Sequence, residues 1–146
     1  MWYVYDNEGI STEADYPYMA KSGFCESNYG GAVEVSKVNP VKSYSKVALL
    51  TAIANGVTSV TIESASLVFR QYTSGVISDT SCGTSLDHAV AAVGYGTDAE
   101  TGLNYYLVRN SWGANWGDHG YVKIARNGDG YGICGIQEIS VWATTN

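Results

Sequence analysis

Short segments of alternating or β-branched apolar residues are the main pattern in this chain, and they predict strands. These segments cover residues 32–41, 57–62, 88–95, 104–110 and 120–125, with a shorter extended piece at 75–77. Gly94 and Gly96 end the third strand, and residues 98–102 form a hairpin-type loop before the fourth. Several strands with many glycines favour an antiparallel sheet that closes on itself as a barrel.

One segment has the spacing of an amphipathic helix. Val47, Leu50 and Ile53 form an apolar stripe over residues 46–54, Ser45 can cap its start, and Asn55-Gly56 ends it. Weaker helical character occurs at residues 2–7 and as a single turn at 67–72. We therefore predict a mainly β fold of the α+β kind, an antiparallel barrel-like domain with one or two short helices.

The polar, turn-rich stretch at residues 23–31 suggests a division of the chain. We place the boundary near Gly30-Gly31, which separates residues 1–30 from a domain at 31–146. Residues 1–6 open inside a segment with ordered character, so we expect an internal piece of a longer protein.

Composition excludes several classes of partner. The formal net charge is -6, and lysine and arginine total only 8. Without a basic cluster, binding to nucleic acid or to an anionic membrane surface is not expected. No run approaches the ~20 apolar residues of a membrane span, and no signal peptide is evident.

The chain has three cysteines, an odd number. In a secreted chain a leftover cysteine suggests a missing partner, and in a cytosolic chain all three can be reduced and buried. Cys82, Cys134, His88 and His119 lack the short ligand spacing of a zinc site, so we predict no metal. We interpret His119 as a surface turn residue.

Two residues at the ends of predicted strands carry candidate chemistry. His88 opens one strand and Asn110 closes a neighbouring one. A histidine suits proton transfer near neutral pH, and an asparagine amide can orient the imidazole ring. Trp112 could cover that hydrogen bond. On spacing alone, however, an ordinary edge histidine and a turn asparagine are the favoured explanation of the pattern.

The local strings around these residues resemble the papain family of cysteine proteases, and most closely its cathepsin L group. The matching landmarks run in family order over nearly the whole chain. They are residues 9–18 with Tyr16-Pro17-Tyr18, Ser74-Gly75-Val76, Leu86-Asp87-His88-Ala89-Val90 with Gly94-Tyr95-Gly96, Asn110-Ser111-Trp112-Gly113 with Trp116-Gly117 and Gly120-Tyr121, and Gly132-Ile133-Cys134-Gly135-Ile136.

The resemblance implies a cysteine endopeptidase of two domains with its active site in the cleft between them. His88 and Asn110 would be catalytic residues on the barrel domain, with Trp112 in support. The nucleophile of the family opens a helix of the other domain in a Cys-Gly-Ser-Cys-Trp type stretch, which does not occur here. Gln71 and Gln137 lie in the wrong contexts to replace the family's oxyanion-hole glutamine. We therefore expect the C-terminal half of such an enzyme, inactive alone and without a cofactor.

The resemblance also assigns roles to the cysteines and to a substrate pocket. Cys82 and Cys134 match a disulfide of the barrel domain, and Cys25 matches a cysteine whose partner lies in the missing domain, so we predict a free thiol there. Matching positions imply an apolar substrate pocket that selects a bulky side chain two residues upstream of the cut. Its lining would be Thr61, Leu86, Ala89 and Ile139, with Ser64 nearby and Asp87 at the cleft border.

Partners and compartment follow from the same resemblance. The intact enzyme would act on peptides or proteins in a lysosomal or vacuolar compartment or after secretion, and would meet a propeptide or cystatin-type inhibitors. Without the N-terminal protease domain, residues 1–30 are expected to be mobile or rearranged, and the exposed face to favour self-association. Two alternatives stay open: a non-catalytic scaffold that binds peptides or inhibitors, and a hydrolase with Ser111 or Cys25 as replacement nucleophile.

Overall fold

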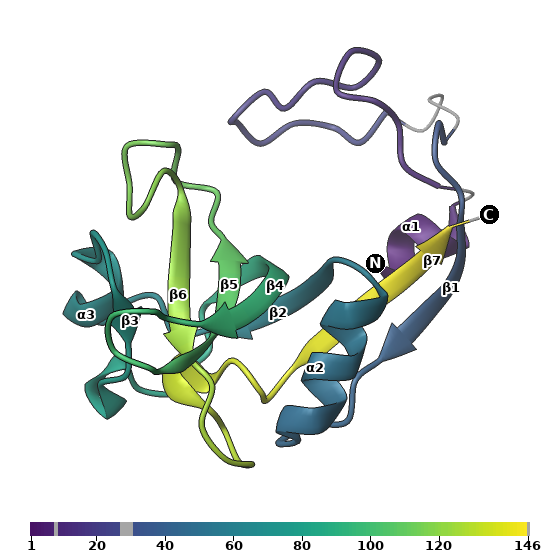
Figure 1. Ribbon diagram of the computed structural model, residues 1–146. Coiled ribbons are helices and arrows are strands. Elements are labelled where there is room, and N and C mark those ends of the chain that lie inside the picture. Colours follow the sequence, from purple (N-terminus) through teal and green to yellow (C-terminus); the bar gives the residue numbers. More distant parts are fainter. Residues whose placement is uncertain (8, 27–30, 146) are drawn as a thin grey trace. The chain divides into compact units, whose positions relative to one another are not determined.

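The computed structural model describes residues 1–7, 9–26 and 31–145 (Figure 1). The chain falls into two compact units. The first contains residues 1–39 and the end of the chain from Ala143, and the second contains Pro40–Trp142. The expected boundary near Gly30 lies outside the described residues, and the division into 1–30 and 31–146 stays a prediction.

The first unit has little buried surface. Its helix α1 (Trp2–Asp6) has no buried residue, although it lies where the sequence predicts helical character. Ile10 forms an isolated antiparallel bridge with Val33, and most of strand β1 (Val35–Pro40) also belongs to this unit. Large apolar side chains are exposed, among them Trp2, Tyr3, Tyr18, Met19 and Phe24.

The second unit contains the strands that build the sheet. They are β2 (Thr58–Ile62), β3 (Val76–Ile77), β4 (His88–Thr97), β5 (Asn104–Arg109), β6 (Tyr121–Ala125) and the start of β7 (Ser140–Thr145). The full strand order is β1-β7-β2-β4-β5-β6-β3. The predicted strands at 57–62, 75–77, 88–95, 104–110 and 120–125 are therefore confirmed, with ends shifted by one or two residues.

Buried residues meet in register on one face of this sheet. Val60 pairs with Val90, Ala92 with Val108, and Val108 with Val122. All five are buried, because paired residues on neighbouring strands point to the same face. This row forms the centre of the core and fixes the register, since a shift by one residue would expose it.

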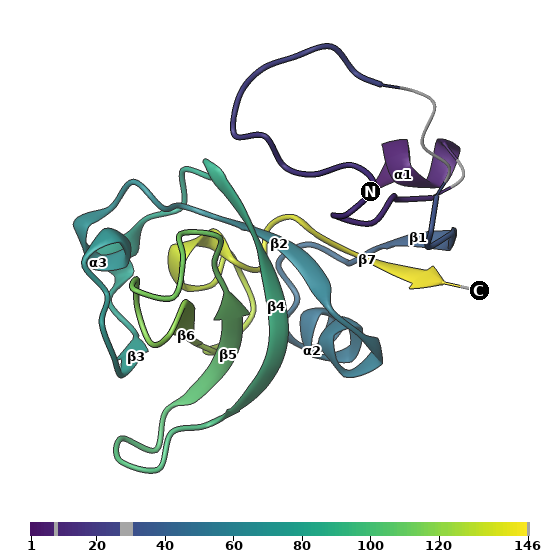
Figure 2. The same ribbon diagram turned by 90° about the horizontal axis from the view of Figure 1, so that it is seen from above.

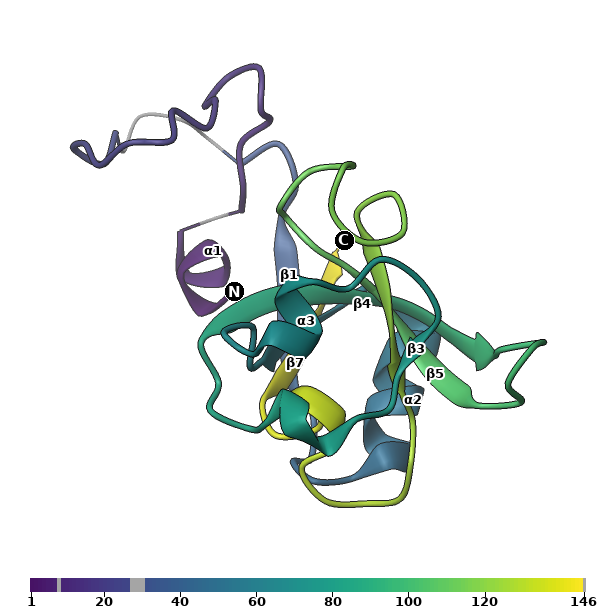
Figure 3. The ribbon, with the colours of Figure 1, turned by 90° about the vertical axis from the view of Figure 1, so that its left-hand side faces the viewer.

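The mainly β class is confirmed, but the sheet is not a closed barrel. The central strands β2, β4, β5 and β6 pair antiparallel and curve, as Figure 2 shows. β3 pairs with β6 in the parallel direction, and no pairing links β3 to β1 within the described ranges. A two-residue strand offers too few backbone groups to continue the sheet, so it stays open at this edge (Figure 3).

The described chain has three α-helices rather than the one or two expected. α2 (Lys46–Asn55) lies where it is predicted, with Ser45 accepting a hydrogen bond from the Ala48 N–H as N-cap. α1 and α3 (Leu67–Arg70) are single turns. Sequence reasoning missed β7 and the short 3-10 helices η1 (Thr80–Cys82) and η2 (Ile133–Gly135). No helix in the described part of the chain is long and apolar enough to cross a membrane.

A disulfide joins Cys82 to Cys134, as the sequence predicts. It links η1 to η2 across a separation of 52 residues, and both half-cystines are buried. In the chain-entropy model, closing a loop of this length stabilises the folded state by about 4 kcal/mol.

The loop between β4 and β5 is organised by Asp98. One carboxylate oxygen accepts hydrogen bonds from the Thr101 N–H and hydroxyl, and the other pairs with the Lys123 ammonium at 3.0 Å. The Lys123 partner and these hydrogen bonds lower the pKa of Asp98 to about 2. The hairpin-type loop predicted at 98–102 is thus held by the Asp98 carboxylate, which must be ionised to pair with Lys123.

Hydrogen exchange should separate the two units. Because α1 buries no residue whereas β4 lies inside the sheet, amides of residues 3–7 and 9–18 are expected to exchange much faster than those of residues 88–97. Mass spectrometry or NMR of the chain in deuterated buffer measures this difference. Protection of residues 9–18 equal to that of β4 would contradict the expectation.

Replacing Asp98 should change the acid stability of the protein. The folded-state pKa is lowered from 3.8 to about 2, so this carboxylate stabilises the fold above about pH 4 and loses that effect as the pH falls toward 2. Asp98→Asn should therefore lower Tm most at neutral pH, with the difference from the parent chain shrinking as acid is added. Glu100→Gln in the same loop is the control, because its side chain makes no described hydrogen bond. A difference in Tm that is independent of pH would contradict this account.

Candidate active site

The pairing of β4 with β5 brings the two candidate catalytic residues together. His88 is the first residue of β4, and Asn110 directly follows β5. These strands are antiparallel, with Ala91 opposite Arg109, so the start of one lies beside the end of the other. His88 lies two residues before the buried Val90 on the same strand, so both side chains point to the core face of the sheet. His88 itself is half-buried.

A hydrogen bond of 2.8 Å joins His88 Nε2 to Asn110 Oδ1. The same oxygen accepts the Ser111 N–H at 2.8 Å, which identifies it as the amide oxygen and not the nitrogen. His88 Nε2 must therefore carry the proton and donate. The neutral ring then presents the lone pair of Nδ1, which has no hydrogen-bond partner within the second unit as described.

Backbone hydrogen bonding holds Asn110 in place. Its N–H donates to the Gly120 carbonyl at 2.9 Å, which extends the pairing of β5 with β6 by one residue. The side chain is 8% exposed, and its Nδ2 has no partner among the described residues. Because the Gly120 carbonyl holds its backbone and the Ser111 N–H holds its amide oxygen, Asn110 can fix the orientation of the His88 ring.

Trp112 lies over this hydrogen-bonded pair. Its ring stacks on the imidazole of His88 with centroids 5.3 Å apart and an angle of 23° between the planes. It also meets the fully buried Phe69 edge to face, with ring centroids 5.5 Å apart. The indole thus shields the histidine–asparagine bond from water on one side.

Sequence reasoning missed the residues that hold Trp112. Trp116 contacts both Trp112 and Phe69, with centroids 5.3 Å and 4.9 Å away, and its Nε1 donates to the Arg70 carbonyl. Tyr72 packs on Trp116 at 5.9 Å. The available signal was the pair of aromatic residues Phe69 and Tyr72 within the predicted turn at 67–72, which are distant in sequence from the tryptophans they support.

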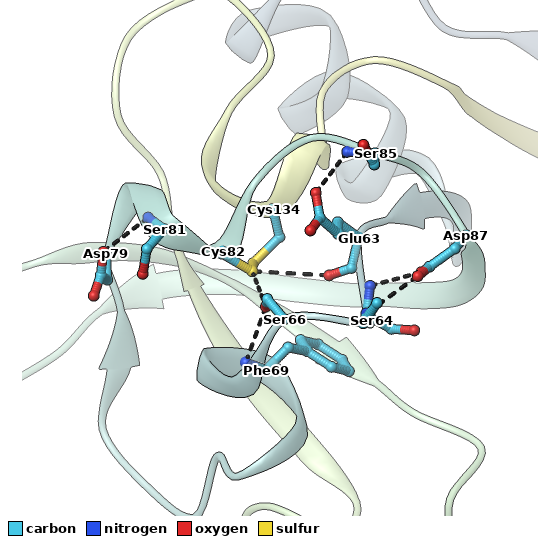
Figure 4. Close-up of a disulfide and its surroundings, with 11 residues drawn as sticks. Glu63, Ser64, Ser66, Phe69, Asp79, Ser81, Cys82, Ser85, Asp87 and Cys134 are labelled. Atoms are coloured by element: carbon cyan, nitrogen blue, oxygen red, sulfur yellow. Dashed lines mark hydrogen bonds between the residues drawn. A yellow bond between two sulfur atoms is a disulfide. The ribbon is translucent and has the colours of Figure 1, made fainter.

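Asp87 closes a turn immediately before His88. Its two carboxylate oxygens accept the backbone N–H groups of Ser64 and Ala65 at 2.7 and 3.1 Å (Figure 4). The hydrogen bond from Ser64 is the largest cause of a lowered pKa for Asp87. Asp87 is exposed, and its own N–H donates to the Ile62 carbonyl. The residue therefore fixes the backbone conformation immediately before His88.

The disulfide lies beside this turn and contacts the cap of α3. Figure 4 shows Cys82 Sγ next to the Ser66 hydroxyl, 3.5 Å away. The same hydroxyl accepts the Phe69 N–H as the N-cap of α3. The cross-link therefore supports the helical turn that carries Phe69 under Trp112.

Three of the expected substrate-pocket residues lie together. Thr61 and Ala89 are opposite each other on β2 and β4. The Thr61 hydroxyl and N–H both donate to the carbonyl of Ile139, at 3.1 and 3.0 Å. Ile139 is 56% exposed and Ala89 is also exposed, so this group presents an apolar surface to solvent.

Leu86 lies slightly apart and packs on the backbone of η2. A Cβ added to Gly135 would come within 2.7 Å of Leu86 Cδ2, and the φ of Gly135 is +74°. A side chain at 135 would therefore displace Leu86 and strain the backbone as well. Leu86 thereby lies against the disulfide-bonded turn.

Cys25 and the glutamines have ordinary surroundings. Cys25 is a free, exposed cysteine whose Sγ lies 3.6 Å from the Tyr3 hydroxyl. Gln71 is exposed, whereas Gln137 is buried and hydrogen-bonded to Tyr106. His119 is exposed in a turn, with a φ of 53°. Across the described residues, no group of three or more His, Cys, Asp and Glu side chains could hold a metal ion.

Comparison with known sequences identifies relatives over nearly the whole chain. A family model described as "Papain family cysteine protease" matches residues 1–144. "Probable cysteine protease RD21B" of Arabidopsis thaliana is 47% identical over 137 residues, which cover 92% of this chain and 29% of the relative. "Papaya proteinase 4" of Carica papaya is 43% identical over 147 residues, 99% of this chain and 41% of the relative. The chain thus spans well under half the length of these curated relatives.

Solved structures show the same fold. The bromelain protease of Ananas comosus in complex with the E64 inhibitor superposes with a TM-score of 0.91 at 35% identity, and the match covers 99% of this chain and 67% of that one. The Amb a 11 cysteine protease, a ragweed pollen allergen in its proform, gives a TM-score of 0.92 at 32% identity over 99% of this chain and 44% of that one.

The tautomer of His88 can be tested directly. Because Asn110 Oδ1 accepts from Nε2, the ¹⁵N spectrum of the neutral ring should show Nε2 protonated and Nδ1 bare. In Asn110→Ala this preference should weaken, and the free energy of unfolding should fall by about 1–3 kcal/mol, since two hydrogen bonds, from His88 Nε2 and the Ser111 N–H, lose their acceptor at about 0.5–1.5 kcal/mol each.

The ring of His119 serves as the internal control, because its exposed side chain makes no described hydrogen bond. Its nitrogen shifts should not respond to Asn110→Ala. A His88 ring protonated at Nδ1 when neutral would contradict the assignment.

Proposed function

Because the chain belongs to the papain family of cysteine proteases, we propose that it supplies the histidine and asparagine of a Cys-His-Asn catalytic set. The nucleophilic thiol then comes from protein outside the sequence described here. The observation that carries the proposal is the 2.8 Å hydrogen bond from His88 Nε2 to Asn110 Oδ1 under the Trp112 ring. It leaves Nδ1 as the nitrogen that would face a thiol.

The proposed roles follow from this arrangement. His88 pairs with the thiol as imidazolium and thiolate, which makes the sulfur a better nucleophile at neutral pH. After the sulfur attacks the peptide carbonyl, His88 delivers its proton to the leaving amine, and it then activates the water that releases the acyl group. Asn110 keeps the ring oriented in each step, and Trp112 shelters their hydrogen bond.

We propose that this chain alone does not hydrolyse peptides. Two of its cysteines form the disulfide, and Cys25 is exposed outside any helix. The family's nucleophile instead opens a helix, where the free N–H groups stabilise a thiolate. Loss of the nucleophile removes covalent catalysis, which is worth several powers of ten in rate.

The substrate class proposed is a peptide with a bulky apolar side chain two residues before the cut. Support comes from the exposed apolar group of Ala89 and Ile139 beside Thr61. Leu86 and Asp87 are assigned to the pocket and its border by the family resemblance. Apolar linings of this kind bind apolar side chains through the hydrophobic effect.

The proposed setting is a lysosomal or vacuolar compartment or the secreted state. A buried disulfide persists best in such oxidising or extracellular environments. Proposed partners of the intact enzyme are its propeptide and cystatin-type inhibitors, in line with the relatives solved in proform or with E64. The exposed aromatic residues of the first unit are proposed to meet the N-terminal protease domain or, without it, a second copy.

A non-catalytic peptide- or inhibitor-binding scaffold is the alternative. It is favoured by one observation, that Thr61 and Ala89 of the candidate pocket lie opposite each other on β2 and β4, a pairing that involves no cysteine. Binding of a peptide aldehyde or a cystatin to the chain without any cleavage, and without gain of activity on adding a thiol-bearing domain, would favour this function.

Complementation distinguishes the two functions. The chain is incubated with a fluorogenic dipeptide substrate, alone and with the N-terminal domain of a papain-family protease expressed separately. We expect no turnover alone and thiol-dependent turnover in the mixture. His88→Ala should lower the restored rate by about 100- to 10,000-fold, the range of general acid–base catalysis.

His119→Ala is the matched control, since it removes the other histidine from an exposed turn and should leave the restored rate unchanged. Turnover by the chain alone that a thiol-directed epoxide abolishes would overturn the proposal. So would restored activity that survives His88→Ala.

A further inference from the structure

Two Asn-Gly pairs in the second unit differ in their surroundings. They are Asn55-Gly56 at the end of α2 and Asn127-Gly128 in the loop after β6. In such pairs the glycine nitrogen can attack the asparagine side-chain carbonyl, because glycine has no Cβ to hinder the approach. The reaction needs a mobile amide and a glycine N–H that is free of hydrogen bonds.

The structure blocks this reaction at Asn55. Its Nδ2 donates to the Thr51 carbonyl at 2.7 Å, which holds the side chain along the helix. The Gly56 N–H donates to the Ala52 carbonyl at 3.1 Å as the C-cap of α2. Both reacting groups are therefore occupied, and cyclisation would require the last turn of the helix to open.

Asn127 has neither restraint. Asn127 and Gly128 are exposed and lie outside helices and strands. Neither the Asn127 amide nor the Gly128 N–H has a hydrogen-bond partner among the residues that the structure describes. An added Cβ would meet no heavy atom within 4 Å at either Gly128 or Gly56, so the two pairs differ in hydrogen bonding and not in the space around the glycine.

We propose that Asn127 is a site of spontaneous deamidation in the folded protein. The Gly128 nitrogen bonds to Cγ of Asn127, its proton leaves to base, and the Cγ–Nδ2 bond breaks to release ammonia. The cyclic imide that forms is opened by water, which gives either aspartate or isoaspartate at 127. No oxidant or cofactor takes part, and water is the only co-reactant.

The isoaspartate product would disturb a buried network. The carbonyls of Gly128 and Gly130 accept hydrogen bonds from Gln137 Nε2 at 3.2 and 2.9 Å, and Gln137 Oε1 accepts from the buried Tyr106 hydroxyl at 2.9 Å. Isoaspartate adds one carbon to the main chain directly before Gly128. The Gly128 carbonyl then moves away from Gln137, and because this residue is only 2% exposed, solvent does not reach its amide to replace the lost hydrogen bond.

The experiment is ageing of the purified chain in mildly alkaline buffer, followed by peptide mass spectrometry and isoaspartate-specific methylation. We expect the peptide with Asn127 to convert and the peptide with Asn55 to stay intact. In a denatured sample both should convert at comparable rates, because the helix no longer protects Asn55. An unconverted Asn127 in the folded chain, or equal conversion at Asn55, would overturn the proposal.

Variants distinguish the deamidation of Asn127 from the loss of stability that it causes. Gly128→Ala and Asn127→Gln should each slow conversion at 127 by at least tenfold, whereas Gly56→Ala should not change it. The aged parent chain should melt a few degrees lower than the fresh one, and aged Asn127→Gln should not. Asn127→Asp introduces the charge without the extra main-chain carbon, so it should melt like the fresh parent chain. If this variant instead shows a Tm as low as that of the aged chain, the lengthened backbone is not the cause of the destabilisation.

Discussion

The antiparallel register of β4 with β5 is the constraint on which the candidate site depends. It places the first residue of one strand beside the residue that follows the other, and so brings His88 and Asn110 within hydrogen-bond distance. The register itself is fixed by the core, because Ala92 and Val108 are both buried where they pair. The geometry of the histidine–asparagine pair is thus set by hydrophobic packing several residues away.

A second set of contacts fixes what surrounds the pair. The disulfide touches the Ser66 hydroxyl, which caps α3, and α3 carries Phe69 under the Trp112 ring. A hydrogen bond to the histidine contributes only about 0.5–1.5 kcal/mol in net terms, so it persists where its environment leaves no competing partner. The stacked indole provides that environment on one side of the imidazole.

The sequence was sufficient for most of the strands and for α2, because their patterns of burial are local. Ser45 at the N-cap and Asn55-Gly56 at the end identify α2 without reference to the rest of the chain. The open edge at β3 could not be predicted, since it depends on how few residues pair with β6. β7 was missed although Val141, Trp142 and Thr144 have strand propensity, because they follow a buried turn without an alternating pattern.

The site was predictable to the extent that its residues lie in continuous strings. His88, Asn110 and Trp112 stand in local motifs, whereas Phe69 and Tyr72 join them only through the fold. Likewise, the identity of the protonated nitrogen on His88 depends on the Ser111 N–H, which fixes the orientation of the Asn110 amide. Such information is three-dimensional, and no spacing rule along the chain contains it.

Among the residues that the structure describes, the contacts that orient the imidazole come from within the second unit. The Asn110 amide, the Gly120 carbonyl that holds its backbone, and the Trp112 ring all belong to residues 40–142. The turn before His88 is likewise closed from inside this unit, by the bonds of Asp87 to Ser64 and Ala65. The acid–base half of the proposed catalytic set is therefore oriented before any thiol is present. A partner domain would then have to place its sulfur beside Nδ1 and supply the oxyanion-hole donor, so that two separately folded pieces form one active site.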